Sequence, residues 1–255
     1  MSVRERLSAA GTLFRQFRPL TALAMLVHDL VRKLTDRHAI LSYAQTGEDR
    51  VIDYYVGYPG SGFYVDVGCH LPARNSATMR LYRRGWRGLC IDANPECIRR
   101  FRKLRPRDTC VTAAVSDAVG ERVFTEFKDA DLSSLSDDFV ATRDPSRIVA
   151  RRRVTTVTLT ELCRRHAVPE RFELLVVDCE GHDLEVLRSL DLDAFRPRIV
   201  AVEMHAFDLS RARENPVHAL LEAHDYRLAA YATMNGYFVD RRTSGDSAAP
   251  GRSAR

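Results

Sequence analysis

Two apolar segments, each with an acidic residue at or near its end, constrain the fold of this chain more than any other feature. Residues 62–72 have the sequence GFYVDVGCHLP, and residues 89–95 have the sequence LCIDANP. Apolar runs of this kind, followed by a turn signal and a helical pattern, are typical of strands buried on both faces of a parallel sheet. The two segments therefore predict neighbouring strands of an α/β fold.

The acidic residues of these segments indicate a ligand. Asp66 lies two residues before Gly68, and Asp92 ends the second strand. Doubly wound sheets bind ligands beyond the carboxyl ends of their strands, where a carboxylate can accept hydrogen bonds from both ribose hydroxyls of a nucleoside. We therefore expect a nucleoside-containing cofactor. The alternative is a β-turn in an unrelated α/β domain, with Gly68 present for its backbone freedom.

The turn after the first strand narrows the choice of cofactor. Its sequence, GCHLPA at residues 68–73, lacks the three glycines that let a backbone approach a pyrophosphate, and the chain has no GxxxxGK[ST] phosphate loop. A cofactor with a ribose but no phosphate, such as S-adenosylmethionine, is therefore favoured. Two alternatives stay open: an NAD-dependent oxidoreductase, which the missing glycines argue against, and a non-catalytic module that binds a nucleoside cofactor.

Composition bears on the core and on the cellular compartment. The chain of 255 residues is 45% hydrophobic, enough for one substantial core. Its six cysteines show no C-x-x-C pair and no zinc-binding spacing, and most lie in apolar runs, where a free thiol behaves as a small hydrophobe. Because the sequence shows no signal-peptide pattern either, we expect a cytoplasmic protein.

The formal net charge of +5 does not by itself indicate a nucleic-acid partner. Nearly all the basic residues are arginines, since Lys33, Lys103 and Lys128 are the only lysines. The densest basic cluster falls on two predicted helices and contains few aromatic residues that could stack on bases. A solvated helix face is the favoured interpretation, and nucleic acid is an unfavoured partner.

Residues 1–40 are predicted to form a helical extension outside the sheet domain. Apolar residues recur there at steps of three and four, and Pro19 is expected in the first turn of a restarted helix. These residues are Leu13, Phe17, Leu20, Ala24, Val27, Val31 and Leu34. The apolar run is too short to span a bilayer. We expect the helix to dock on the sheet or on a second subunit, with contact to a membrane surface as the less favoured alternative.

Strand and helix patterns alternate over residues 41–240, which predicts one domain with a mostly parallel sheet. Predicted strands cover residues 63–67, 88–92, 109–115, 121–127, 154–157, 174–178 and 199–204. Predicted helices cover residues 74–84, 95–104, 159–166 and 216–224, and another ends at residue 190. A hairpin that closes the domain is predicted for residues 228–231 and 237–239. The expected architecture is the Rossmann-like class I methyltransferase fold, a seven-stranded sheet with a reversed last strand and helices on both faces. Residues 241–255 are predicted to be a disordered tail.

Seven sequence blocks along this domain carry a resemblance to a known family. They are SYAQTGED at 42–49, YVDVGCHLP at 64–72, NSAT at 75–78, YRRGWRG at 82–88, IDANP at 91–95, AAVSD at 113–117 and VDCEGHD at 177–183. In this order and spacing the chain resembles the FkbM-type S-adenosylmethionine-dependent methyltransferases over residues 42–240. The resemblance implies methyl transfer to a small-molecule or glycan acceptor, usually a hydroxyl oxygen on a sugar or on a polyketide-type natural product. It identifies neither the acceptor nor the oligomeric state, and a homo-oligomer stays open.

The resemblance and the residue chemistry together suggest how the cofactor is held. We expect Gly68 to let the backbone pass close to the cofactor, Asp66 to reach its ammonium group, and Asp92 to hold its ribose. Each acid has an alternative role as a helix cap or turn former. The remaining expected cofactor-binding residues are Cys69, His70, Ala93, Ser116, Asp117, Gln45 and Asp49, with Asp117 against the adenine amino group.

Methyl transfer to a hydroxyl group requires removal of the hydroxyl proton. Asp178 ends one predicted strand, with Glu180 and His182 two and four residues further on, and Glu203 and His205 end the next strand. We expect the base among these residues, with His205 favoured over Asp178 and an acid orienting the histidine. The less favoured alternative is Mg²⁺ or Mn²⁺ held by Asp178 and Glu203.

Overall fold

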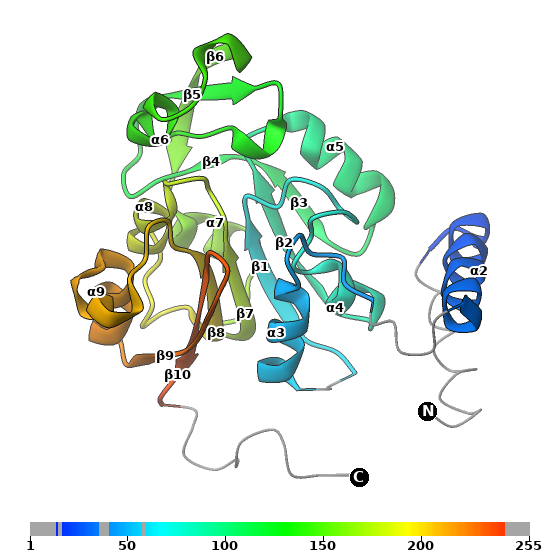
Figure 1. Cartoon of the computed structure of the whole chain (residues 1–255). Coiled ribbons are helices and arrows are strands. Elements are labelled where there is room, and N and C mark those ends of the chain that lie inside the picture. Colours follow the sequence, from blue (N-terminus) through cyan, green and yellow to red (C-terminus); the bar gives the residue numbers. More distant parts are fainter. Residues whose placement is uncertain (1–13, 15–16, 36–40, 58–59, 243–255) are drawn as a thin grey trace.

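The centre of the fold is a seven-stranded sheet in the order β3-β2-β1-β7-β8-β10-β9 (Figure 1). The computed structural model describes residues 14, 17–35, 41–57 and 60–242. The strands are β3 (Thr109–Thr112), β2 (Arg87–Asp92), β1 (Phe63–Val67), β7 (Arg171–Val177), β8 (Arg196–Glu203), β10 (Asn235–Asp240) and β9 (Tyr226–Ala232). β10 is antiparallel to both of its neighbours, and the other adjacent pairs are parallel. The predicted mostly parallel sheet with a reversed last strand is confirmed.

Alternation along each strand divides the core between the two faces of the sheet. On β1, Val65 and Val67 belong to one buried cluster, and Tyr64 belongs to the other. The helices α7 (Leu159–Arg165), α8 (Asp183–Arg188) and α9 (Pro216–Ala223) contribute side chains to the first cluster, and α3 (Glu48–Val56), α4 (Met79–Arg83) and α5 (Pro95–Leu104) contribute to the second. Both faces of the strands are therefore apolar, as the near-continuous hydrophobic runs predicted.

Helix starts follow the capping residues of the sequence. Asn94 accepts a hydrogen bond from the backbone N–H of Glu96 at the start of α5, where Pro95 takes the first helical position. α4 is shorter than the predicted helix over residues 74–84. The chain before it turns at Asn75, whose φ is 52°, and the Thr78 side chain bonds to Asp66 instead of capping the helix.

A second, three-stranded sheet extends from the carboxyl end of the main sheet. It has the order β4-β6-β5, with β4 (Ala114–Val115), β6 (Ile148–Val157) and β5 (Glu121–Phe127). The predicted strand over residues 109–115 is divided, because after Thr112 the chain leaves β2 and pairs with Thr156 and Val157 of β6. The short helices η1 (Ala130–Leu132), α6 (Asp137–Ala141) and η2 (Pro145–Arg147) connect β5 to β6.

The N-terminal helix α2 (Pro19–Thr35) begins at Pro19 as predicted. Ala22 on α2 and the preceding Phe17 are buried in a small cluster with Met79 and Tyr82 of α4. In the described residues this helix therefore docks on α4 and not on the sheet, while contact with a second subunit stays a prediction. Met25 and Leu26 pack against this cluster and are partly buried. Six large apolar side chains of the helix are exposed: Leu20, Leu23, Val27, Leu30, Val31 and Leu34. Leu13 and the predicted tail from residue 243 onward lie outside the described residues.

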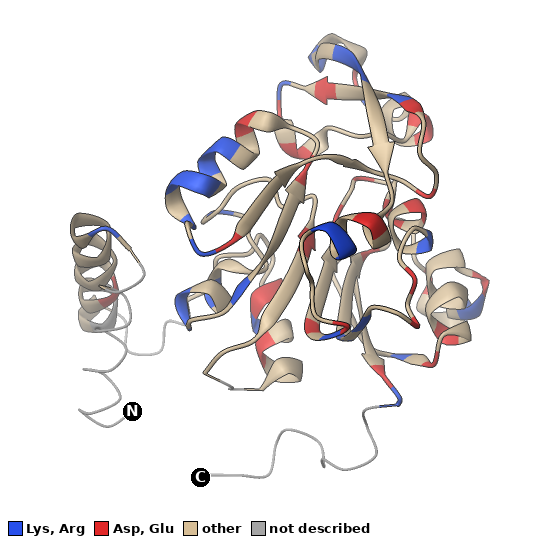
Figure 2. Ribbon diagram, turned by 180° about the vertical axis from the view of Figure 1, so that it is seen from behind, with Lys and Arg blue, Asp and Glu red and all other residues tan. Residues whose placement is uncertain are grey.

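Only part of the basic cluster is a solvated face, namely the basic residues along α5 (Figure 2). Arg105, which follows α5 and belongs to the same cluster, is fully buried, and Arg80 and Arg84 pair with the buried Asp53. Arg99 and Arg100 are exposed, and both pair with Glu96 one turn earlier on the same helix. Such pairs along one helix suit a water-exposed surface. Of the helices within residues 17–35, 41–57 and 60–242, none has the length and apolar character required to cross a bilayer.

Deletion of residues 1–38 is expected to leave the affinity for S-adenosylhomocysteine unchanged, because α2 contacts the domain through α4, on the outside of the sheet. Solubility or oligomeric state should change, since Met79 and Tyr82 lose their cover. Calorimetry and size-exclusion chromatography of the truncated protein would test both expectations. A folded truncation that no longer binds S-adenosylhomocysteine would place the helix in the site.

Candidate active site

The carboxyl ends of β1, β2, β7 and β8 border two cavities of about 560 and 550 Å³. The first cavity includes Asp92, the second includes Asp66, and both are lined by Gly68 and Asp178. The two cavities therefore adjoin at this pair of residues. Their location agrees with the general position of ligands in doubly wound sheets.

Gly68 brings the ends of β1 and β7 together. Its φ of 79° lies in the left-handed region, and a Cβ added there would be 1.8 Å from the carbonyl oxygen of Asp178. The Gly68 N–H donates to the Ile91 carbonyl at 2.9 Å, and the Asp178 N–H donates to the Val67 carbonyl at 3.0 Å. Only glycine fits this turn, so Gly68 determines how closely Asp178 approaches the cavities.

Asp92 is held at the edge of the first cavity by two backbone hydrogen bonds. The N–H of His70 donates to one carboxylate oxygen at 2.9 Å, and the N–H of Asn94 donates to the other at 2.7 Å. Burial nevertheless raises the pKa of Asp92 to about 6. A carboxylate has lone pairs beyond those two, so Asp92 can still accept hydrogen bonds from ribose hydroxyls.

The first cavity has both apolar and polar lining residues. The apolar ones include Val67, Ile91, Ala93, Ala113, Ala114, Val115, Phe124 and Leu135. Such a lining, together with the Asp92 carboxylate, suits a ribose joined to a flat, weakly polar ring. Ala93 and His70, both expected to bind the cofactor, line this cavity as well.

The segment 130–135 covers the first cavity. Ser134 is buried, its hydroxyl donates to the carbonyl of Glu180 at 2.7 Å, and its backbone pairs with Thr125. This segment therefore ties β5 to the turn after β7. These contacts join residues that are far apart along the chain, so no local sequence pattern predicts them.

The second cavity is more polar. Asp66, Gln45, Glu48, Asn75 and Ser76 line it together with Cys69. Asp66 is buried, it accepts a hydrogen bond from the Thr78 hydroxyl at 2.5 Å, and burial raises the pKa of its carboxyl group. The polar and acidic lining of the second cavity is suited to an amino-acid group that carries an ammonium.

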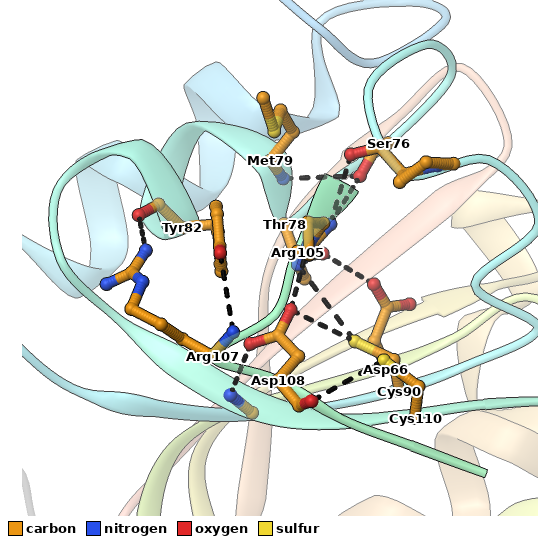
Figure 3. Close-up of polar contacts among 12 residues, drawn as sticks. Asp66, Ser76, Thr78, Met79, Tyr82, Cys90, Arg105, Arg107, Asp108 and Cys110 are labelled. Carbon is orange, nitrogen blue, oxygen red and sulfur yellow. Dashed lines mark hydrogen bonds and ion pairs between the residues drawn. The ribbon is translucent and has the colours of Figure 1, made fainter. Parts of the chain in front are cut away.

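A fully buried arginine orders the residues around Asp66 (Figure 3). Arg105 pairs with Asp108 at 2.8 Å and donates to the hydroxyls of Tyr64 at 2.7 Å and Thr78 at 3.0 Å. Thr78 in turn donates to Asp66. The chain Arg105–Thr78–Asp66 thus links α5 to the second cavity. The sequence predicts a solvated helix face for the basic cluster that includes Arg105. The apolar periodicity of a short helix does not reveal that one guanidinium at its end is buried.

Three of the five predicted catalytic residues converge beyond β7 and β8. His205 Nε2 lies 3.0 Å from Glu203 Oε2 and 3.9 Å from Glu180 Oε2. Asp178, two residues before Glu180, borders both cavities. The Glu203 carboxylate raises the pKa of His205, and burial together with repulsion from Glu203 raises the pKa of Glu180 to about 8. This Glu180–Glu203–His205 cluster is the acceptor-side candidate.

Phe139 of α6 packs over this cluster. Its ring centroid lies 5.4 Å from that of His205. A Cβ added at Gly181 would lie 3.0 Å from the Cβ of Phe139, so the two residues are in close contact. Gly181 has a φ of 84°, and the preceding Glu180 has a φ of 50°. Two consecutive left-handed residues turn the chain sharply after β7, which directs Glu180 towards β8.

Three more sequence-predicted residues, His182, Asp117 and Asp49, lie apart from the Glu180–Glu203–His205 cluster or outside both cavities. His182 lines the first cavity, where its Nε2 lies 3.0 Å from the Ser116 hydroxyl, so it is apart from the Glu180–Glu203–His205 cluster. Asp117 is exposed and pairs with Arg122 at 3.4 Å, outside both cavities. Asp49 is buried and accepts hydrogen bonds from Ser42 and Tyr43. The roles predicted for these residues stay predictions.

Asp92→Ala is expected to weaken S-adenosylhomocysteine binding by about 1–3 kcal/mol, because buried hydroxyl donors of the ligand lose their acceptor. Since the ribose binds the charged carboxylate and the pKa is about 6, affinity of the native protein should fall as the pH drops below that value. Calorimetry over roughly pH 5 to pH 8 measures both effects.

The matched control is Asp193→Ala, which removes an exposed carboxylate outside both cavities and should leave affinity unchanged. If the affinity of Asp92→Ala for S-adenosylhomocysteine falls at low pH as it does in the native protein, a group other than Asp92 causes the pH dependence.

Arg105→Met is expected to lower the free energy of unfolding by about 3–5 kcal/mol, because the carboxylate of Asp108 then stays buried without its cation. Cofactor affinity should also fall, since Thr78 loses the contact that orients it towards Asp66. Urea denaturation and calorimetry test this. Arg99→Met, which changes an exposed arginine of the same helix, should alter neither quantity.

Comparison with known proteins bears on this site. The chain matches the profile of the methyltransferase FkbM domain over residues 66–228, a stretch that contains Asp66, Asp92, Asp178 and His205. Among solved structures it is similar to a TehB-like SAM-dependent methyltransferase from Corynebacterium glutamicum ATCC 13032 Kitasato. The identity is 14%, the alignment covers 87% of this chain and 100% of that chain, and the TM-score is 0.40. No curated protein matches the chain significantly.

Proposed function

Because the chain belongs to the FkbM methyltransferase family, we propose that it methylates a hydroxyl oxygen of a sugar or polyketide-type natural product, with S-adenosylmethionine as methyl donor. The observation that carries this proposal is the arrangement of two adjoining cavities, one with Asp92 and one with Asp66, beside the Glu180–Glu203–His205 cluster. Cytoplasmic location, predicted from the cysteines, is part of the same proposal.

The residues of the two cavities fit the parts of this cofactor. Asp92 would accept hydrogen bonds from the ribose, Phe124 and its apolar neighbours would contact the adenine, and Asp66 would face the ammonium. Gly68 lies between the two groups, and a side chain there would collide with the backbone of Asp178. When bound, S-adenosylmethionine supplies a methyl group that is already strongly electrophilic.

The remaining task is to activate the acceptor. As the acceptor oxygen forms its bond to the methyl carbon, the bond from that carbon to sulfur breaks and the hydroxyl proton must leave. Asp178 and the Glu180–Glu203–His205 cluster are the groups that adjoin the junction of the cavities. Orientation of the oxygen by this cluster would contribute much of the rate.

A thermal-shift comparison tests the cofactor. S-adenosylhomocysteine should raise the melting temperature and NAD should not, because a ligand that binds only the folded protein stabilises it. Stabilisation by NAD alone would favour the oxidoreductase, and stabilisation by S-adenosylhomocysteine without methyl transfer to any hydroxyl acceptor would favour the non-catalytic module.

His205→Ala is expected to lower methyl-transfer turnover about 10²–10⁴-fold, since it removes the imidazole at the centre of the cluster. Affinity for S-adenosylmethionine should change little, because His205 lines neither cavity. Single-turnover assays with purified acceptor measure the effect. His28→Ala, on the exposed side of α2, is the control, and full activity of His205→Ala would exclude the histidine from the reaction.

A further inference from the structure

Glu180, Glu203 and His205 bring three ligand atoms to one point beyond the ends of β7 and β8. These atoms all lie within 4.8 Å of one another. We propose that the three side chains bind a divalent cation of the Mn²⁺ or Mg²⁺ type. The sequence had favoured His205 as a general base and had named Asp178 and Glu203 as the alternative metal ligands; the geometry favours a metal and changes the ligand set.

The separation between His205 and Glu203 is that of two neighbouring ligands of an octahedral cation. Ions of this class bind their ligands at about 2.1 Å, so neighbouring ligands lie about 3.0 Å apart and opposite ligands about 4.2 Å apart. Nε2 of His205 is 3.0 Å from Glu203 and 3.9 Å from Glu180. One cation can therefore reach all three atoms with little movement of the side chains.

Two of the ligand atoms are buried and form no hydrogen bond. Glu203 is only 5% exposed, and neither its Oε2 nor Nε2 of His205 has a hydrogen-bond partner among the described residues. The two atoms lie 3.0 Å apart. Buried polar atoms without partners are costly. A cation between them satisfies both atoms through their lone pairs.

The surrounding charge is negative. Asp178 and Asp183 lie near Glu180 and Glu203, and within the described part of the chain no lysine or arginine forms an ion pair with any of these four carboxylates. Arg143, the nearest basic neighbour of Glu180, stacks on the ring of Phe139 at 4.0 Å. A divalent cation would supply the positive charge that the described side chains do not.

The donor set also bears on the choice of ion. Two carboxylate oxygens and one imidazole nitrogen suit Mn²⁺, and the oxygen ligands admit Mg²⁺. Three protein ligands leave room in an octahedral shell for water or an acceptor oxygen. His205 is about one-third exposed, with 32% of its side-chain surface accessible, so an ion can enter from solvent. A role in holding the acceptor rests on the proposed function, whereas cation binding does not.

The experiment titrates metal-free, full-length protein with Mn²⁺ in the absence of cofactor and acceptor, and follows the free ion by electron paramagnetic resonance. One Mn²⁺ per chain is expected. Glu203→Gln and His205→Ala should each weaken binding at least tenfold, and Glu203→Asp should restore part of the affinity. Glu185→Gln, which alters a carboxylate beside His182, should bind Mn²⁺ like the native protein.

A spectroscopic measurement on the native protein covers the case in which a buried variant fails to fold. Electron spin-echo modulation of bound Mn²⁺ should show coupling to a directly bonded imidazole nitrogen, and this coupling should vanish in His205→Ala. Absence of Mn²⁺ binding to the folded native protein, or binding without nitrogen coupling, would overturn the proposal and leave a protonated His205 paired with Glu203. Binding of S-adenosylhomocysteine, measured separately, reports on the proposed function independently of the cation.

Discussion

The guanidinium of Arg105, which has no exposed surface, is the interaction on which the cofactor side of the structure depends. It neutralises the buried Asp108 and donates to Tyr64 on β1 and to Thr78 before α4. The aromatic ring of Phe101 lies 4.8 Å from it. A charge buried to this degree is tolerated only when its hydrogen-bonding groups are matched. Arg105 finds all its hydrogen-bond partners only when β1, α4 and α5 are correctly placed. Asp66 depends on the same contacts, because its partner Thr78 is one of these acceptors.

A second constraint is steric and acts at the junction of the cavities. Gly68 leaves no space for a side chain beside the Asp178 carbonyl, and the N–H of Asp178 bonds to β1 in return. The two cavities therefore have a common floor at Gly68 and Asp178. Beyond it, the left-handed backbone of Glu180 and Gly181 turns the chain towards His205. Cofactor and acceptor groups are thus positioned by backbone turns rather than by flexible loops.

How well each site residue could be predicted depended on the range of its contacts. Asp92 could be selected from the sequence as a site residue because it ends an apolar run that predicts a strand. The residues whose N–H groups hold it, His70 and Asn94, follow two such runs directly. Arg105 could not be selected in this way, because its partners are up to 41 residues away along the chain and its helix looked like a solvated face. Asp117 had a suitable position in the sequence, yet its side chain points to Arg122 at the surface.

The sequence by itself determined the alternation of strands and helices, the reversed last strand and the acids at the strand ends, because apolar periodicity and turn residues act over a few positions. Only the tertiary structure decided which of those acids meet. Glu180 lies in the turn after β7 and Glu203 ends β8, so their approach to His205 depends on the pairing of β7 with β8 and on the turn at Gly181. Distances between such groups are set by packing across the sheet, which no local pattern encodes.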